Sequence, residues 1–189
     1  IELGLVGSEM CIRDRRYMHE FGLTEDHLAK VSVKARNHGK HNPDAQLREP
    51  TTVEEVNRSR PVADPLKLFH CCPSGDGAAA VLICAEDVAS KYGGVPINVV
   101  GSEINSGKYM TGFRDMTSPE ITVRGAAQLY EEAGIGPEDI DLAEVHDAFS
   151  IAELLYYEAL GFCPRGEAGR LIDEGETSVG GRIPVNPSG

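Results

Sequence analysis

The chain has 189 residues, a formal net charge of −12, 41% hydrophobic residues and 25% charged residues. This length allows one large domain or parts of two, and the composition is ordinary for a protein with a hydrophobic core. The acidic charge argues against nonspecific nucleic-acid binding and against docking on anionic membranes. No apolar run approaches the roughly 20 residues of a membrane helix. The five irregularly spaced cysteines do not resemble a disulfide framework, and the start lacks a secretion pattern, so we expect a cytoplasmic protein.

Residues 1–15 do not share the pattern of the chain that follows. In particular, residues 6–15 resemble the translation of a sequencing adapter at the end of an environmental gene fragment. We therefore expect residues 1–15 to be non-native, leave them out of the fold prediction and assign no role to Cys11. The alternative is a genuine N-terminal segment.

Three helices are predicted in the first third of the chain. One covers residues 16–21 and ends at Gly22. The next begins after Thr24, whose hydroxyl can cap it, and the third begins at the capping box formed by Thr52 and Glu55. The second helix and the residues just after it carry a basic cluster, which we interpret as a solvated face. Its members are Lys30, Lys34, Arg36, His38, Lys40 and His41.

Strands and helices are predicted to alternate in the middle of the chain. Residues 77–84 are continuously apolar, as in a strand buried on both faces, and residues 97–101 form a second buried strand. A short helix over residues 85–92 separates them. Ser118 and Pro119 start another helix, as N-cap and first residue, and Gly134 closes it. Its apolar face is interpreted as core and contains Val123, Ala126, Ala127 and Tyr130. This alternation predicts a parallel or mixed α/β sheet.

The most informative stretch is residues 144–149. The short run 141–145 is predicted to be a buried strand. Ser150 and Glu153 have the spacing of a capping box that opens a helix over residues 151–160. His146 should therefore lie where a strand ends and a helix begins, which is where open α/β sheets bind ligands. A single histidine at such a point is more often structural than catalytic, so position alone leaves its role open. Residues 162–189 show no helical period.

The run His70, Cys71 and Cys72 raises the question of a metal or a nucleophile. Adjacent ligands do not easily share a tetrahedral centre, because zinc sites prefer cysteines separated by two or more residues. We therefore predict no metal site. A reactive thiolate needs only a depressed pKa, but we interpret both cysteines as small residues in a tight loop.

Four blocks, taken together and in this order, resemble the thiolase superfamily, in particular the sterol-carrier-protein-2-type thiolases. They are residues 60–66, 71–80, 144–149 and 185–189, and the resemblance covers roughly residues 16–189. It implies an α/β, thiolase-like fold of mixed sheets with helices on both faces, present here only in part. Residues 16–93 would be the end of the N-terminal half with part of the loop domain. Residues 94–189 would be a truncated C-terminal half.

The resemblance also implies an activity and a set of site residues. The family's acyl-CoA C-acyltransferases form or cleave 3-ketoacyl-CoA with coenzyme A, and the thioester is a substrate, so no cofactor is expected. His146 matches the catalytic position that helps build an oxyanion hole for the enolate, and Glu144 or Asp147 could fix its tautomer. Cys72 and Ser74 would lie near the pantetheine path, and Phe149 would wall the acyl pocket.

The family's nucleophilic cysteine, its Gly-His-Pro histidine and its second cysteine are absent from these residues. We therefore expect the chain by itself to be inactive and the complete gene product to be an enzyme, assembled as a homodimer or tetramer. One alternative is a thiolase-fold aldolase that acts on steroid-CoA side chains with a zinc-bearing OB-fold partner; such relatives tend to carry tyrosine at position 146. Another is a non-catalytic, acyl-CoA-binding subunit.

Overall fold

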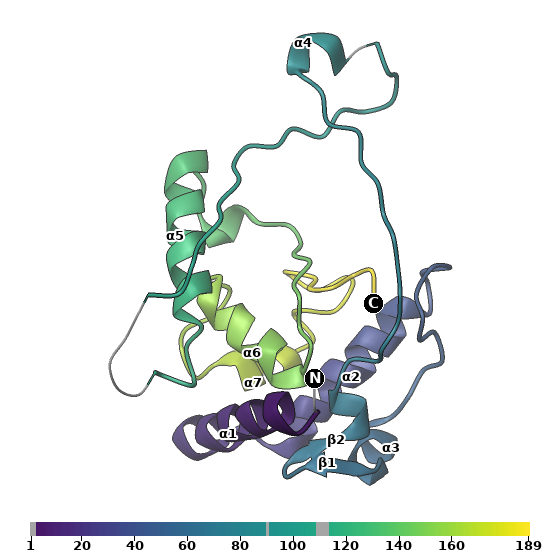
Figure 1. The fold of residues 1–189 in the computed structure, drawn as a ribbon, viewed down its shortest axis with the longest axis vertical. Coiled ribbons are helices and arrows are strands. Elements are labelled where there is room, and N and C mark those ends of the chain that lie inside the picture. The colour runs from purple at the N-terminus through teal and green to yellow at the C-terminus, as the bar shows by residue number, and fades with distance from the viewer. Residues whose placement is uncertain (1–2, 90, 109–113) are drawn as a thin grey trace.

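The computed structural model describes residues 3–89, 91–108 and 114–189. Within these ranges most regular structure is helical (Figure 1). The elements are α1 (Leu3–Phe21), α2 (Glu25–Gly39), α3 (Val53–Arg58), β1 (Pro61–Ala63), β2 (Leu66–Lys67), η1 (Leu68–His70), α4 (Glu86–Ala89), α5 (Glu120–Ala133), η2 (Pro137–Asp139), α6 (Ser150–Ala159) and α7 (Ala168–Asp173). None of the described helices is long and apolar enough to cross a membrane.

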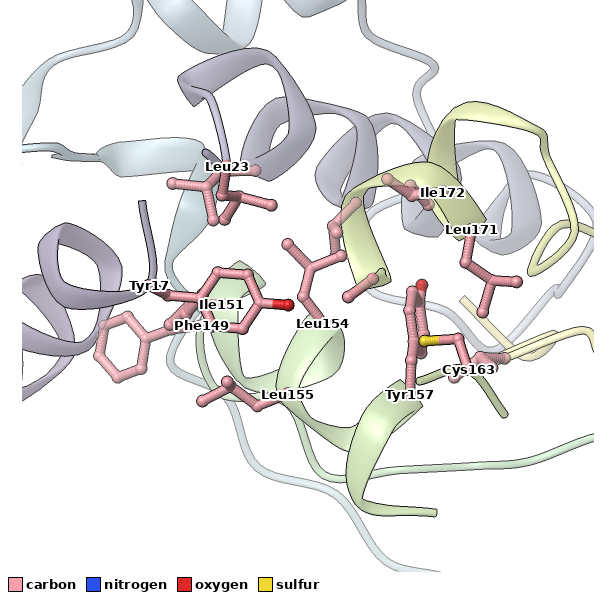
Figure 2. Close-up of a cluster of buried hydrophobic side chains, with 14 of the residues drawn as sticks. Tyr17, Leu23, Phe149, Ile151, Leu154, Leu155, Tyr157, Cys163, Leu171 and Ile172 are labelled. Atoms are coloured by element: carbon pink, nitrogen blue, oxygen red, sulfur yellow. The ribbon is translucent and has the colours of Figure 1, made fainter. Parts of the chain in front are cut away.

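Helix α6 is the centre of the core and packs against α1, α2, α5 and α7. Leu154 and Tyr157 on α6 are fully buried. Figure 2 shows these side chains among others that come from α1, from α7 and from the turn before α2. We call this part of the molecule, made of α1, α2, α6, α7 and residues 174–189, the helical body.

Local signals determine several helix ends as predicted. Thr24 caps α2, because its Oγ1 accepts a hydrogen bond from the His27 backbone N–H at 3.4 Å. The Glu55 N–H donates to Thr52 Oγ1 at 3.2 Å in the predicted capping box of α3. Gly22 ends α1 at a φ of +72°, a left-handed conformation that costs glycine little.

The two buried strands predicted over residues 77–84 and 97–101 are not formed. In the described ranges the only sheet is the antiparallel pair β1–β2. Val81 is 84% exposed and Ile97 is 87% exposed. Figure 1 shows this part of the chain as a long extended arm with α4 at its far end. We define residues 73–89 and 91–100 as the arm. A strand needs a neighbour to pair its backbone N–H and C=O groups, and the described residues provide none here.

Other local predictions also need correction. Residues 141–145 form no strand but one isolated parallel bridge, between Ala143 and Val185. Ser150 lies inside α6 instead of capping it. The N-cap residue is Phe149, whose side chain makes no capping hydrogen bond. The N-cap of α5 is Pro119, one residue after the predicted N-cap, Ser118. Helix α7 lies in a segment where no helical period was visible, and its six residues are too few to show one.

Helix α1 begins at Leu3, well before the predicted start at Arg16. Asp14 on this helix is fully buried, and neither carboxylate oxygen has a hydrogen-bond partner among the described residues. Burial raises the pKa of Asp14 to about 7. An unpaired buried carboxylate is unusual in a packed core. The non-native origin of residues 1–15 stays a prediction.

Candidate active site

The segment of residues 143–149 is held between two distant parts of the chain. At its start, the Ala143 N–H donates to Pro184 O at 3.0 Å, and the Asn186 N–H donates to Ala143 O at 2.8 Å. At its end, Phe149 forms an antiparallel bridge with Cys71. The Cys72 N–H donates to Ala148 O at 3.0 Å. The structure thus brings together the blocks around Cys72, His146 and Val185, although they are far apart in sequence.

His146 is exposed and lines an open cavity of about 390 Å³. The cavity lies between α5, α6 and residues 140–146, and its lining is mostly apolar. The lining residues are Thr122, Ala126, Leu129, Tyr130, Ile140, Ala143, Glu144, Val145, His146, Tyr156, Leu160 and Phe162. A hydrogen bond donated by an imidazole is electrostatically stronger beside apolar walls than in water. The arrangement can therefore stabilise negative charge that develops on a ligand oxygen.

The sequence predicts that the apolar face of α5 belongs to the core, and this prediction is wrong. None of the described residues of this helix is buried, and Val123 is 43% exposed. Ala126 and Tyr130 instead line the cavity beside His146. The Tyr130 hydroxyl donates to Leu160 O at 2.9 Å, which ties α5 to the end of α6.

The two carboxylates considered as partners of His146 are both engaged elsewhere. Glu144 accepts hydrogen bonds from the Ser188 backbone N–H at 3.0 Å and from the Ser188 hydroxyl at 2.8 Å. Asp147 lies against Glu153. Burial, together with the neighbouring Glu153 carboxylate, raises the pKa of Asp147 to about 8. Asp147 is therefore largely protonated at neutral pH and suited to donate a hydrogen bond to Glu153.

The other site residues occupy contrasting environments. Phe149 is only 7% exposed and packs in the hydrophobic core; it does not line the cavity of His146. Cys72 and Ser74 are exposed on the chain that leaves the helical body, where Ser74 O accepts a hydrogen bond from Gln46 Nε2 at 3.2 Å. Their roles toward an acyl group or pantetheine stay predictions.

The half-buried thiol of Cys71 and the buried thiol of Cys163 are not activated. Burial raises the pKa of Cys71 to about 11 and that of Cys163 to about 12. Both groups are therefore thiols at neutral pH and poor nucleophiles. Among the residues that the structure describes, no group of three or more histidine, cysteine or acidic side chains could hold a metal ion.

A buried polar network beneath His146 was missed by the sequence analysis. Lys34 Nζ lies 2.6 Å from Glu153 Oε1, and their side chains are 3% and 0% exposed. The Tyr157 hydroxyl also donates to Glu153, and Asn186 Nδ2 donates to its Oε2 at 3.1 Å. We call Lys34, Asp147, Glu153, Tyr157 and Asn186 the polar network.

The interpretation of the basic cluster as a solvated face is wrong for Lys34 and His38, which are buried, while Lys40 and His41 are exposed. A signal for this was present in the sequence. Lys34 follows Val31 by three residues, and Glu153 precedes Tyr157 by four, so each charge lies on the apolar side of its helix. A charge in an apolar stripe predicts a buried partner, but it does not say which.

Sequence and structure comparisons define the class of protein. Residues 102–189 match the family model described as "Thiolase C-terminal domain-like". The solved structure of an Ltp2-ChsH2(DUF35) aldolase aligns with 96% of this chain and 49% of its own chain, at a TM-score of 0.75 and 28% sequence identity. The fold is thus thiolase-like and partial, which confirms the predicted class, although the described residues form only a two-stranded sheet.

Curated relatives agree with this class. The benzoylsuccinyl-CoA thiolase subunit BbsB of Thauera aromatica is 49% identical over 179 residues, which cover 94% of this chain and 46% of the relative. An acetyl-CoA acetyltransferase of Methanothermobacter thermautotrophicus is 46% identical, with 93% and 46% covered. Sterol carrier protein 2 of Rattus norvegicus is 37% identical, with 93% and 33% covered.

Over most of its length the chain is similar to members of the thiolase superfamily, and its residues 102–189 match a thiolase C-terminal model. It spans between a third and about half of the length of these curated relatives.

Proposed function

We propose that the complete gene product is an acyl-CoA C-acyltransferase that forms or cleaves 3-ketoacyl-CoA with coenzyme A. The observation that carries the proposal is His146, an exposed imidazole at the wall of a mostly apolar cavity, in a chain related to thiolases. We also propose a cytoplasmic location, which is supported by the free thiols of Cys71, Cys72, Cys84 and Cys163.

The proposed role of His146 is electrostatic. Carbon–carbon bond formation next to a thioester places negative charge on the thioester oxygen as the enolate develops. An N–H donor fixed in advance stabilises that charge without reorganisation during the reaction, and losing one such donor typically costs about 10²–10³ in kcat. The exposed His146 ring can reach a bound thioester from the cavity side.

The nucleophile is not assigned to any residue of this chain. Cys71 and Cys163 are held as thiols by burial, and the other described cysteines do not match the family's catalytic blocks. We therefore expect these 189 residues alone to bind or position a thioester at most, and not to turn it over.

A thiolase-fold aldolase is the second candidate, and the structural match to the Ltp2-ChsH2(DUF35) aldolase favours it. This enzyme would cleave a steroid-CoA side chain together with a zinc-bearing OB-fold partner. His146 weighs against it, since those relatives tend to carry tyrosine there. A non-catalytic acyl-CoA-binding subunit is the third candidate, and one relative is itself named as a thiolase subunit. For the acyltransferase we expect a homodimer or tetramer.

The test is coenzyme-A-dependent cleavage of acetoacetyl-CoA by the purified complete gene product. His146→Ala should lower kcat by on the order of 10²-fold or more. His146→Asn keeps an N–H donor and should retain more activity than His146→Ala. His19→Ala is the matched control, because His19 is exposed on α1, outside the cavity, and should leave kcat unchanged.

Two results would contradict the proposal. A folded, complete gene product without cleavage activity would leave the aldolase and the non-catalytic subunit, which an aldol-cleavage assay with a steroid-CoA substrate then separates. Full activity in His146→Ala would remove His146 from the oxyanion hole.

A further inference from the structure

Asn186 connects the rest of the polar network to residues 143–149, the segment that contains His146. The residue is 6% exposed, and its side-chain amide makes two hydrogen bonds. Its Oδ1 accepts from the Val145 backbone N–H at 2.7 Å, and its Nδ2 donates to Glu153 Oε2 at 3.1 Å. An amide side chain offers an acceptor to one neighbour and a donor to the other.

The backbone of Asn186 is fixed as well. Its N–H donates to Ala143 O at 2.8 Å, and its carbonyl oxygen lies 2.8 Å from His38 Nδ1, which donates to it. The φ angle of Asn186 is +51°, in the left-handed region, where asparagine is tolerated better than most side chains. Backbone and side chain of this one residue therefore hold Ala143 and Val145 at the same time.

Glu153 cannot rotate away from Asn186 without losing other partners. It is fully buried, its Oε1 pairs with Lys34, and it accepts from Tyr157. Lys34 Nζ in turn donates to Val185 O at 2.6 Å, next to Asn186 in sequence. The network is thus closed around Asn186, and the amide faces the Val145 N–H from a fixed position.

His146 has no comparable support of its own. Its ring makes no hydrogen bond to the residues that the structure describes, and the flanking carboxylates contact Ser188 and Glu153 instead. The direction of the imidazole therefore depends on the backbone of Val145, the residue just before it.

We propose that Asn186 is a positioning residue, whose side-chain amide clamps the Val145 backbone to the buried Lys34–Glu153 pair and so orients His146 toward the cavity. Its effect on catalysis rests on the proposed function, since it acts through His146. The clamp itself is a geometric claim and can be measured without activity.

The test compares two variants of the complete gene product that each lose buried hydrogen bonds. Asn186→Gly removes the amide without backbone strain, because glycine adopts positive φ freely. The control is Thr177→Val. Thr177 is fully buried, and its hydroxyl lies 3.1 Å from the Tyr157 hydroxyl, to which it can donate because Tyr157 donates its own hydrogen to Glu153. Both variants remove hydrogen bonds of the same buried network, but only Asn186→Gly removes the acceptor of the Val145 backbone N–H.

Asn186→Gly should lower kcat for acetoacetyl-CoA cleavage by roughly 10- to 100-fold, the scale of a misplaced catalytic group, and leave KM nearly unchanged. Thr177→Val should keep the wild-type kcat. Amide hydrogen exchange is measured on the same samples. The Val145 amide should exchange faster in Asn186→Gly than in wild type and should keep its protection in Thr177→Val.

The outcomes separate this proposal from the proposed function. If wild type is active and the two variants have equal kcat, Asn186 is only structural and the positioning role is overturned, while the thiolase reaction stands. If wild type is inactive, the thiolase reaction fails, and equal Val145 exchange in the two variants overturns the clamp. If Asn186→Gly does not fold, the wild-type protein provides the test: a Val145 amide that exchanges as fast as an unprotected amide rules out the clamp.

Discussion

The arm exposes hydrophobic side chains, whereas the helical body buries a pair of charged ones. In the arm, aliphatic side chains such as Val81 and Ile97 are more than four-fifths exposed, at 84% and 87%. In the helical body, the charged pair Lys34–Glu153 is almost completely buried. Figure 1 shows the arm extending away from the packed helices.

This contrast shows that the burial of a side chain depends on the packing and hydrogen-bonding partners available to it as well as on its residue type. A helix pairs its own backbone groups and needs only one packed face. A strand depends on its neighbours for every backbone hydrogen bond, so an apolar run without a neighbouring strand has nothing to pack into. A charge, conversely, is buried when a counter-charge and hydrogen bonds surround it.

The largest effect is expected from breaking the buried ion pair. Lys34→Met leaves the buried Glu153 side chain without its cation, which should cost about 3–5 kcal/mol of unfolding free energy. Lys30→Met is the matched control on the same helix. Lys30 pairs with Asp173 at 2.6 Å, but both side chains are about 40% exposed, so this loss should be about 1 kcal/mol or less.

Urea unfolding measures both variants. The double variant Lys34→Met/Glu153→Gln should recover part of the loss, because no uncompensated charge stays buried. Equal destabilisation by Lys34→Met and Lys30→Met would mean that the Lys34–Glu153 pair is hydrated in solution, and the contrast with the arm would then weaken.

A smaller effect is expected from Asp147, whose pKa is raised from 3.8 to about 8 by burial and by Glu153. The folded state binds this proton more tightly than the unfolded state. Its stabilising contribution is therefore complete below the unfolded pKa and declines as pH rises toward the folded value. This group alone should lower the unfolding free energy by about 2 kcal/mol between roughly pH 5 and pH 7.

The measurement compares urea unfolding of wild type and Asp147→Asn across this pH range. Asparagine keeps a donor for Glu153 but does not titrate, so the variant should show a flatter pH dependence. Asp14, with a pKa raised to about 7, contributes in the same direction and is present in both proteins, so the difference isolates Asp147. Parallel pH profiles would show that Asp147 titrates normally.

The smallest effect is expected in the arm itself. Leu82 is 71% exposed, and Leu82→Ala should change the unfolding free energy by less than about 0.5 kcal/mol. Its control is Leu154→Ala in α6, where the side chain is fully buried and truncation should cost about 2–5 kcal/mol. Thermal or urea unfolding checks both; a loss in Leu82→Ala near that of Leu154→Ala would show that the arm is packed in solution.

The parts of the fold that were predicted correctly are those determined within a few residues. Thr24 and Thr52 cap helices through neighbours three positions away, and Gly22 and Gly134 end helices through their own positive φ angles. The predictions that failed required distant partners. The strands at residues 77–84 and 97–101 needed neighbouring strands, and the face of α5 needed a packed element to cover it.

The candidate site also has features that the local sequence predicts and features that depend on distant contacts. Four blocks of residues in the sequence are enough to predict the resemblance to thiolases and to single out His146. The support of His146 is visible only in the folded protein, because the contacts of Asn186 with Val145 and Glu153 join segments 41 and 33 residues apart. The spacing of neighbouring residues determines helix caps and turns, but it does not specify which side chains from distant segments come into contact. The burial of Lys34, Glu153 and Asn186 depends on such contacts.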